Sequence, residues 1–177
     1  MARNNNLFII ECIPRSEKLN ESLVLSNVLR MTEPDAIHTQ AVKSKSQMLG
    51  YLRSKRDLLR FDFVHISAHG GDDNESIDLP QRSLRPEEFP EGCFSRQTVT
   101  LSACGMSRTD FVSEFMETTR ASHVIAPVHD VQFIDAAVWF INLYYLVLHH
   151  KYTPEGAFER TNSILKGKAK GGFQFWT

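Results

Sequence analysis

FDFVHISAHGG, residues 61–71, is the stretch of sequence that decides the fold. Its run of apolar and β-branched residues predicts a buried strand, which stops at His69 and two glycines. A second stretch of the same kind, QTVTLSACG at residues 97–105, stops at Cys104 and a glycine. Two buried strands that each end on a reactive side chain predict a parallel sheet with a site at the carboxyl ends of its strands.

Short strand-like runs alternate with segments of helical period along the rest of the chain. This alternation is typical of an α/β fold, in which a mostly parallel sheet of about six strands carries helices on both faces. The length of 177 residues suits a single domain, and no internal repeat divides it. The other strands are expected at residues 7–12, 35–42, 122–128 and 173–177.

Several segments between these strands have the period of amphipathic helices. The first helix is expected to open with Ser16 as its N-cap and to bury one face, made of Leu19, Leu23, Val24 and Val28. A second is expected at residues 46–59, with Met48, Leu49, Leu52 and Leu59 near one stripe. Thr109 or Asp110 can cap a third helix, and an apolar helix is expected at residues 133–149. Thr153 is expected to cap a last helix, with Pro154 in its first turn.

Two segments are predicted to lie outside the regular α/β pattern. Residues 71–96 are polar and contain three prolines, which favours a long loop with one short turn of helix. The C-terminal segment 167–172 is expected to be flexible, and residues 173–177 are expected to return as a possible edge strand. Such an edge could pair with a second subunit or be covered by a partner.

Composition excludes several classes of function. The formal net charge of -1, from 20 basic and 21 acidic residues, lacks the basic footprint of a nucleic-acid-binding protein. Three cysteines without CxxC spacing predict neither a disulfide framework nor a zinc ribbon. The longest apolar run, residues 138–148, is shorter than a bilayer requires. We therefore expect a cytoplasmic protein that uses no metal and no organic cofactor.

His69 and Cys104 are the candidate catalytic pair. If their strands are neighbours, the strands lie about 5 Å apart, and the imidazole and the thiol can approach each other at the same edge of the sheet. A thiol beside an imidazole can lose its proton and attack a peptide carbonyl as a thiolate. Gly70 and Gly105 follow the two residues, and glycine lets the backbone turn sharply and direct an N–H at a developing oxyanion.

These motifs resemble the caspase-like cysteine peptidases (clan CD), and within them the CHAT-domain branch. The resemblance rests on HISAHGG, on TLSACG, and on SHVIAPV followed by a long aromatic helix and TPEGAFERTN. It implies a three-layer αβα sandwich, with His69 as the catalytic histidine and Cys104 as the nucleophile. It also implies an oxyanion hole made by the backbone N–H groups of Gly70 and Cys104.

The resemblance further implies where a substrate would bind. In relatives that cut after basic residues an acidic residue commonly stands two before the nucleophile, and Ser102 stands there in this chain. In caspases an arginine in the loop after the first strand helps to hold an aspartate, and Arg15 lies in the corresponding loop of this chain. His129 and Asp130, in the loop after the fifth strand, are expected to form another wall of the substrate pocket. Members of the branch are regulated by other modules, and some belong to bacterial immune systems. A protein substrate and a regulator or effector in trans are therefore expected.

Other interpretations remain open. A caspase-like domain can act as a protein-interaction module without catalysis, as some relatives do. A zinc site built from Cys12, His65, His69, Cys104 and His123 is disfavoured, because the spacing of these ligands is unlike known zinc sites. No GxSxG elbow of an α/β-hydrolase is present. The sequence does not identify a third residue that would orient His69.

Overall fold

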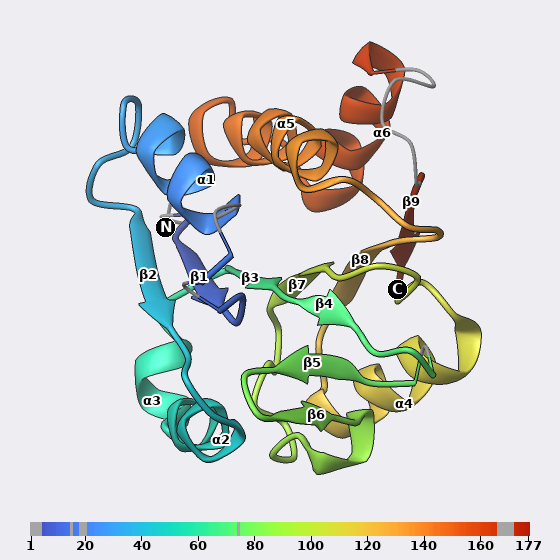
Figure 1. The fold of residues 1–177 in the computed structure, drawn as a ribbon. Coiled ribbons are helices and arrows are strands. Elements are labelled where there is room, and N and C mark those ends of the chain that lie inside the picture. Colours follow the sequence, from blue (N-terminus) through green and yellow to red (C-terminus); the bar gives the residue numbers. More distant parts are fainter. Residues whose placement is uncertain (1–4, 15, 18–20, 74, 166–171) are drawn as a thin grey trace.

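The computed structural model describes residues 5–14, 16–17, 21–73, 75–165 and 172–177. A six-stranded sheet, in the order β2-β1-β3-β7-β8-β9, runs through its centre (Figure 1). The first five of these strands are parallel, and β9 is antiparallel to β8. The strands are β1 (Leu7–Glu11), β2 (Ile37–Ala41), β3 (Phe63–Ser67), β7 (Thr98–Ser102), β8 (His123–Pro127) and β9 (Phe173–Trp176). The mostly parallel sheet and the returning C-terminal edge strand are both confirmed.

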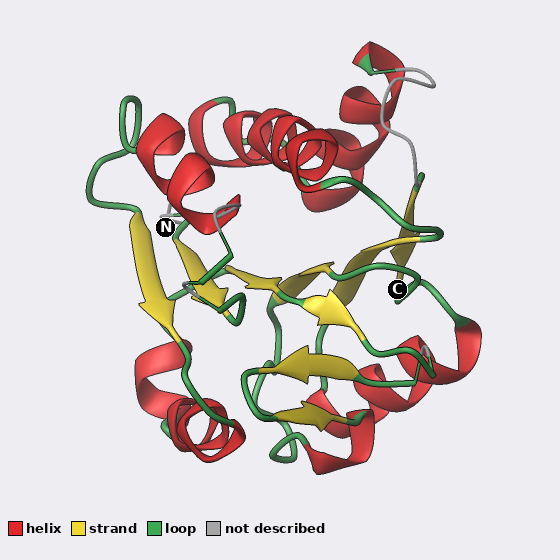
Figure 2. Cartoon of the chain, in the orientation of Figure 1, coloured by secondary structure: helices red, strands yellow, loops and turns green. Residues whose placement is uncertain are grey.

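Helices cover both faces of this sheet and complete a three-layer α/β arrangement (Figure 2). One face carries α1 (Glu21–Leu29), α5 (Phe133–Tyr144) and α6 (Pro154–Ile164). The other face carries α2 (Lys45–Arg53), α3 (Lys55–Leu58) and α4 (Thr109–Thr119). Each face has its own hydrophobic core, because alternate residues of every strand point to opposite sides.

Residues 71–96 are not the loop that their polarity predicts. They contribute β5 (Ile77–Leu79) and β6 (Arg82–Leu84), which form a small antiparallel sheet with β4 (His69–Gly70). Ile77, Leu79 and Leu84 are buried and anchor this sheet to the core below the main sheet. Strands of two or three residues are too short to leave a period in the sequence. The short turn of helix is present as the 3-10 segment Pro86–Glu88.

The predicted inner face of α1 is wrong. Leu23, Val24 and Val28 are exposed, and the buried face instead holds Glu21, Ser22, Leu25, Ser26 and Leu29. Ser16 lies in a turn, and Leu19 falls outside the described residues. Glu21 and Ser22 have hydrogen-bond partners on the sheet, which apolar periodicity cannot reveal.

Two other helix predictions need correction at their ends. The segment expected at residues 46–59 is divided at Ser54 into α2 and α3, and Leu59 is exposed. Arg108, rather than Thr109 or Asp110, is the N-cap of α4. The cap of α6 is confirmed, because the Thr153 hydroxyl accepts a hydrogen bond from Gly156 N.

The long apolar helix continues beyond α5 as a π-helical turn, η2 (Tyr145–His149). The segment expected to be flexible, residues 167–172, lies outside the described residues except for Gly172, which has a φ of +55°. Within the described ranges, no helix is both long enough and apolar enough to cross a membrane.

Candidate active site

The register of β3 and β7 brings His69 and Cys104 to the same level at the carboxyl edge of the sheet. Phe63 pairs with Thr98 and Ser67 with Ser102, so partners are 35 residues apart, as are His65 and Thr100. Ala68 N donates to Ser102 O at 3.1 Å and extends the pairing beyond the ends of both strands. His69 and Cys104 are separated by the same 35 residues.

Gly70 lies directly against the backbone of Cys104. A Cβ built on Gly70 would be 2.1 Å from the Cys104 carbonyl oxygen and 3.3 Å from its amide nitrogen. No larger residue fits at that distance without moving the backbone. Gly71 N donates to Ser76 O, so the alternation of an antiparallel ladder turns the N–H of Gly70 away from β5. The backbone of Gly70 therefore lies against that of Cys104, with its N–H on the side away from β5.

The Cys104 side chain is half-buried in the turn that follows β7. Gly105 has a φ of +66°, a left-handed conformation that glycine adopts at little cost. The Cys104 thiol donates to the carbonyl oxygen of Val131 with an Sγ–O distance of 3.6 Å. In the described part of the chain, no hydrogen bond joins this thiol to His69.

His69 is held from two sides. Its Nε2 lies 2.9 Å from Glu17 Oε2, and both side chains are 41% exposed. The ring of Phe133, at the start of α5, meets the imidazole edge to face with a centroid distance of 5.4 Å. A carboxylate only accepts hydrogen bonds, so an ionised Glu17 places the proton of neutral His69 on Nε2. Nδ1 is then the nitrogen that can take a proton.

Glu17 is the functional candidate that sequence reasoning missed. It belongs to the loop after β1, whose carboxyl end lies beside that of β3 in the sheet. That placement favours an acidic residue of this loop as the partner of His69. Glu11, Glu17 and Glu21 all lie near the loop, however, and only the folded chain distinguishes them.

A row of buried polar residues lies at the carboxyl ends of the strands, next to His69 and Cys104. Glu11, Ser67 and Ser102 are register partners at the ends of β1, β3 and β7, and all three are buried. The Ser67 hydroxyl donates to Glu21 Oε2 at 3.0 Å, whereas Glu21 Oε1 has no hydrogen-bond partner among the described residues. Ser102, expected at the substrate, is therefore placed inside the sheet, beside Ser67.

A second buried polar group continues this row along the same face. His65 Nδ1 lies 2.8 Å from Thr100 Oγ1 and 3.0 Å from Tyr144 OH, and its Nε2 is 3.5 Å from Glu21 Oε2. Burial raises the pKa of Tyr144 well above its ordinary value. This network ties α5 and the start of α1 to the two strands that carry the site.

The predicted wall residues meet beside Cys104. His129 and Asp130 line a pocket of about 330 Å³ together with Val128, Gly105 and Arg108. Arg108 is the residue that sequence reasoning did not connect with this wall. Arg15 lies outside the described residues.

Asp73, four residues after His69, shapes a turn. Asp73 Oδ1 accepts hydrogen bonds from Glu75 N and the Ser76 hydroxyl, and Asp73 Oδ2 pairs with Arg85. These hydrogen bonds, the first of them above all, lower the pKa of Asp73. Asp73 therefore holds the turn that follows His69.

Metal-ligating side chains are scattered. No group of three or more histidine, cysteine, aspartate or glutamate residues in the described ranges is placed to hold a metal ion. Cys12 and Cys93 are buried, and burial raises the pKa of the Cys12 thiol. Cys104 is thus the reactive thiol candidate of the chain.

A comparison with protein-family models and a comparison with curated proteins both gave no match. The chemistry that the site supports follows from its own geometry.

Proposed function

We propose that this protein is a cysteine endopeptidase that cleaves a protein substrate through a thioester acyl-enzyme. Cys104 is the nucleophile, His69 transfers protons, and Glu17 orients His69. The observation that carries the proposal is the common level of His69 and Cys104, with Gly70 against the Cys104 backbone. This arrangement supports the proposal, because the reaction needs a base, a thiol and backbone N–H donors at one edge of the sheet.

Each step of the reaction has a group to perform it. His69 Nδ1 takes the proton of the Cys104 thiol, and the thiolate attacks the carbonyl carbon of the substrate. The N–H groups of Gly70 and Cys104 stabilise the oxyanion. The C–N bond then breaks, His69 gives its proton to the departing amine, and the thioester remains. Water, activated by the same imidazole, hydrolyses the thioester and releases the acid and the thiol.

The Cys104 thiol donates to Val131 O in the structure, and the reaction requires that it leave this acceptor. A protonated thiol that donates to a carbonyl must rotate before it can give its proton to His69. Val131 precedes α5, so a partner that displaces this segment would release the thiol. This supports regulation in trans, which the resemblance to the CHAT branch also implies. We extend the proposal to a role in a bacterial immune or cell-death system on that resemblance alone.

Alkylation of the thiol tests the proposal without knowledge of the substrate. Iodoacetamide should modify Cys104 alone, because Cys12 and Cys93 are buried. We expect His69→Ala to slow modification about tenfold or more at neutral pH, because the thiolate loses its base. His150→Ala, at an exposed histidine beyond η2, is the matched control and should leave the rate unchanged.

Equal rates of Cys104 alkylation in the wild-type protein and in His69→Ala would contradict the proposed pairing of His69 with Cys104. An irreversible peptidyl acyloxymethyl ketone mixture that labels Cys104 only with His69 present would extend the result from thiol activation to acyl transfer. If neither reagent distinguishes the variants, the domain is better described as a protein-interaction module of the same fold.

A further inference from the structure

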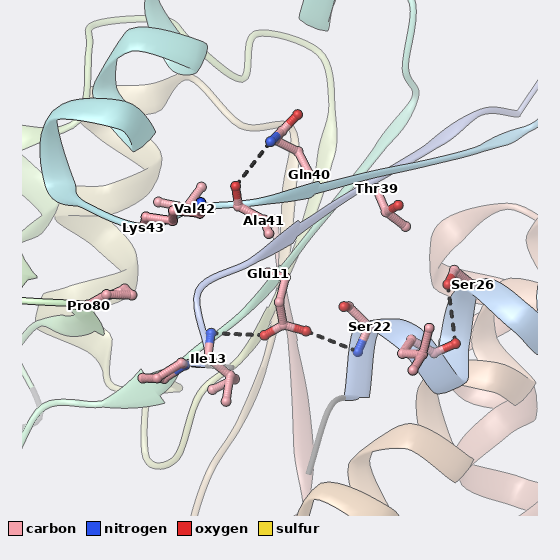
Figure 3. Close-up of a pocket in the computed structure, with 12 residues that line it drawn as sticks. Glu11, Ile13, Ser22, Ser26, Thr39, Gln40, Ala41, Val42, Lys43 and Pro80 are labelled. Carbon is pink, nitrogen blue, oxygen red and sulfur yellow. Dashed lines mark hydrogen bonds between the residues drawn. The ribbon is translucent and has the colours of Figure 1, made fainter. Parts of the chain in front are cut away.

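A pocket of about 460 Å³ opens at the carboxyl ends of β1 and β2 (Figure 3). In the strand order, β2 lies on the opposite side of β1 from β3 and β7, which lead to His69 and Cys104. We call it the β1–β2 pocket. Its lining comes from the end of β1 and the next residues, from α1, from β2 and its following loop, and from Pro80. Ligands of α/β proteins bind at this edge of the sheet. Nothing in the proposed chemistry at Cys104 uses this pocket.

Glu11 brings a buried carboxylate to this pocket. It is 5% exposed, and it accepts hydrogen bonds from Ile13 N at 2.9 Å, from Ser22 N at 3.3 Å and from the Ser22 side chain. Burial raises the pKa of Glu11, so its charged form is not fully compensated. A carboxylate has about four acceptor positions, so the donors among the described residues leave room for one more. A cation in the pocket would stabilise the ionised carboxylate.

The walls around this carboxylate are largely apolar. Ile13 and Val42 are buried, and Pro14 and Pro80 are half-buried beside them. An apolar wall that ends at a carboxylate matches a lysine or arginine side chain, whose methylene stem prefers apolar contact and whose charged head needs an anion. A ligand that was only apolar would desolvate the Glu11 carboxylate further and bring no positive charge to it.

The edge of β2 offers main-chain groups to the same ligand. Ala36 O accepts from Leu7 N, and Val42 N donates to Glu11 O, so even-numbered residues of this segment face β1. By alternation, the N–H and C=O of Thr39 point outward from the open edge of the sheet. The outward carbonyl oxygens on either side of Thr39 already accept hydrogen bonds. Ile37 O accepts one from the Arg30 side chain, and Ala41 O accepts one from the Gln40 side chain. Thr39 lines the pocket, and among the described residues nothing hydrogen-bonds to its outward carbonyl.

We propose that the β1–β2 pocket docks an extended polypeptide segment that carries a lysine or arginine. One residue of that segment exchanges two main-chain hydrogen bonds with Thr39, as a strand added to a sheet edge does. A basic side chain of the segment enters the pocket and places its ammonium or guanidinium group at Glu11. The site is an exosite: it selects a polypeptide partner independently of whether the Cys104 thiol is active.

Lys43 sets the charge at the rim of the pocket. It is exposed and lines the opening, where its ammonium group opposes an incoming cation. A substitution of Lys43 therefore tests the proposal without disturbing the buried interior. Replacing its positive charge by a negative one should favour binding of a basic ligand, because only the charge at the pocket opening changes.

Binding of three terminally blocked tripeptides, Val-Lys-Val, Val-Arg-Val and Val-norleucine-Val, tests the proposal by NMR on the full-length 15N-labelled protein. The amide signals of Ile13 and Ser22 report directly on Glu11, since both donate to its carboxylate. The amide signal of Thr39 reports on pairing at the edge. We expect the basic peptides to shift all three signals and to bind about tenfold more tightly than the norleucine peptide.

Two variants sharpen the test. Lys43→Glu should tighten binding of the basic peptides by about two- to fivefold and leave the norleucine peptide unaffected. Glu11→Gln should remove the preference for basic peptides. If this variant does not fold, the effect of Lys43→Glu on the affinity for basic peptides tests the proposal instead. Equal affinity for all three peptides, or no shift of these signals at millimolar peptide, would overturn the proposal. Neither result bears on catalysis, which is measured by alkylation of Cys104.

Discussion

Gly70 and Cys104 touch through their backbones, and this contact joins the small sheet of β4–β6 to the end of β7. Because a Cβ at position 70 would fall 2.1 Å from the Cys104 carbonyl oxygen, the contact requires glycine. It fixes the distance between the strand end that carries His69 and the turn that carries Cys104. The geometry of the site therefore depends on a residue that bears no side chain.

Gly70→Ala should separate these two segments. We expect a loss of about 1–3 kcal/mol in the free energy of unfolding, because the methyl group meets backbone rather than a flexible side chain. Cys104 alkylation should slow in parallel, since His69 and Cys104 move apart. Gly50→Ala is the matched control: nothing lies within 4 Å of a Cβ there, and the residue is inside α2. The control should gain about 0.5–1 kcal/mol, measured by urea denaturation. Equal effects of the two substitutions would contradict this account of Gly70.

Glu17→Ala should weaken the reactivity of Cys104 while the fold is retained. Glu17 and His69 are both partly exposed, so their ion pair contributes little to stability, but it selects the tautomer of His69. We expect the rate of alkylation to fall several-fold and its pH profile to change shape. Glu17→Gln, which can still accept a hydrogen bond from Nε2, should restore part of the rate. A pH profile identical to that of the wild type in both variants would show that Glu17 does not position His69.

The strands of the main sheet could be predicted from the sequence, and the reason is physical. Buried parallel strands are continuous apolar runs, and β3 and β7 end at Ser67 and Ser102, two residues before His69 and Cys104. His69 itself belongs to β4 of the small sheet, and Cys104 lies in the turn after β7, so the sequence located the candidate pair near the ends of neighbouring strands but not in their last positions. It also found β9, because FQFW has strong β propensity after a glycine-rich segment.

Polar burial and very short strands could not be predicted in the same way. Apolar periodicity assigned Leu23 and Val28 to the core of α1, but Glu21 faces inward, because Ser67 donates to it and the His65 ring lies beside it. Such partners come from distant parts of the chain. The partner of His69 had three acidic candidates around one loop, and tertiary geometry alone selects Glu17.

The buried Tyr144 hydroxyl should contribute measurably to stability. It lies 2.5 Å from Thr100 Oγ1 and 3.0 Å from His65 Nδ1, in a site without access to water. Tyr144→Phe removes both interactions and should cost about 1–2 kcal/mol in the free energy of unfolding. Tyr145→Phe, one residue later and exposed, should cost nearly nothing. Chemical denaturation of the two variants compares them directly, and similar costs would argue against a stabilising network around His65.

His123 should make the protein less stable as the pH falls. Burial lowers the pKa of His123, so the folded state binds a proton less readily than the unfolded chain. Its contribution is fully favourable above the ordinary histidine pKa of about 6.5, and stability is lost as the pH falls through the lowered value. Its ring lies 5.2 Å from that of Phe175 in β9, so we expect protonation to loosen the C-terminal edge of the sheet.

The variant His123→Gln removes this titrating group. It should lose less stability than the wild type between about pH 7 and pH 5. His38, whose pKa burial also lowers, remains in the variant, so the slope should shrink without vanishing. Thermal unfolding across this range measures both slopes, and an unchanged slope in His123→Gln would assign the acid sensitivity to other groups.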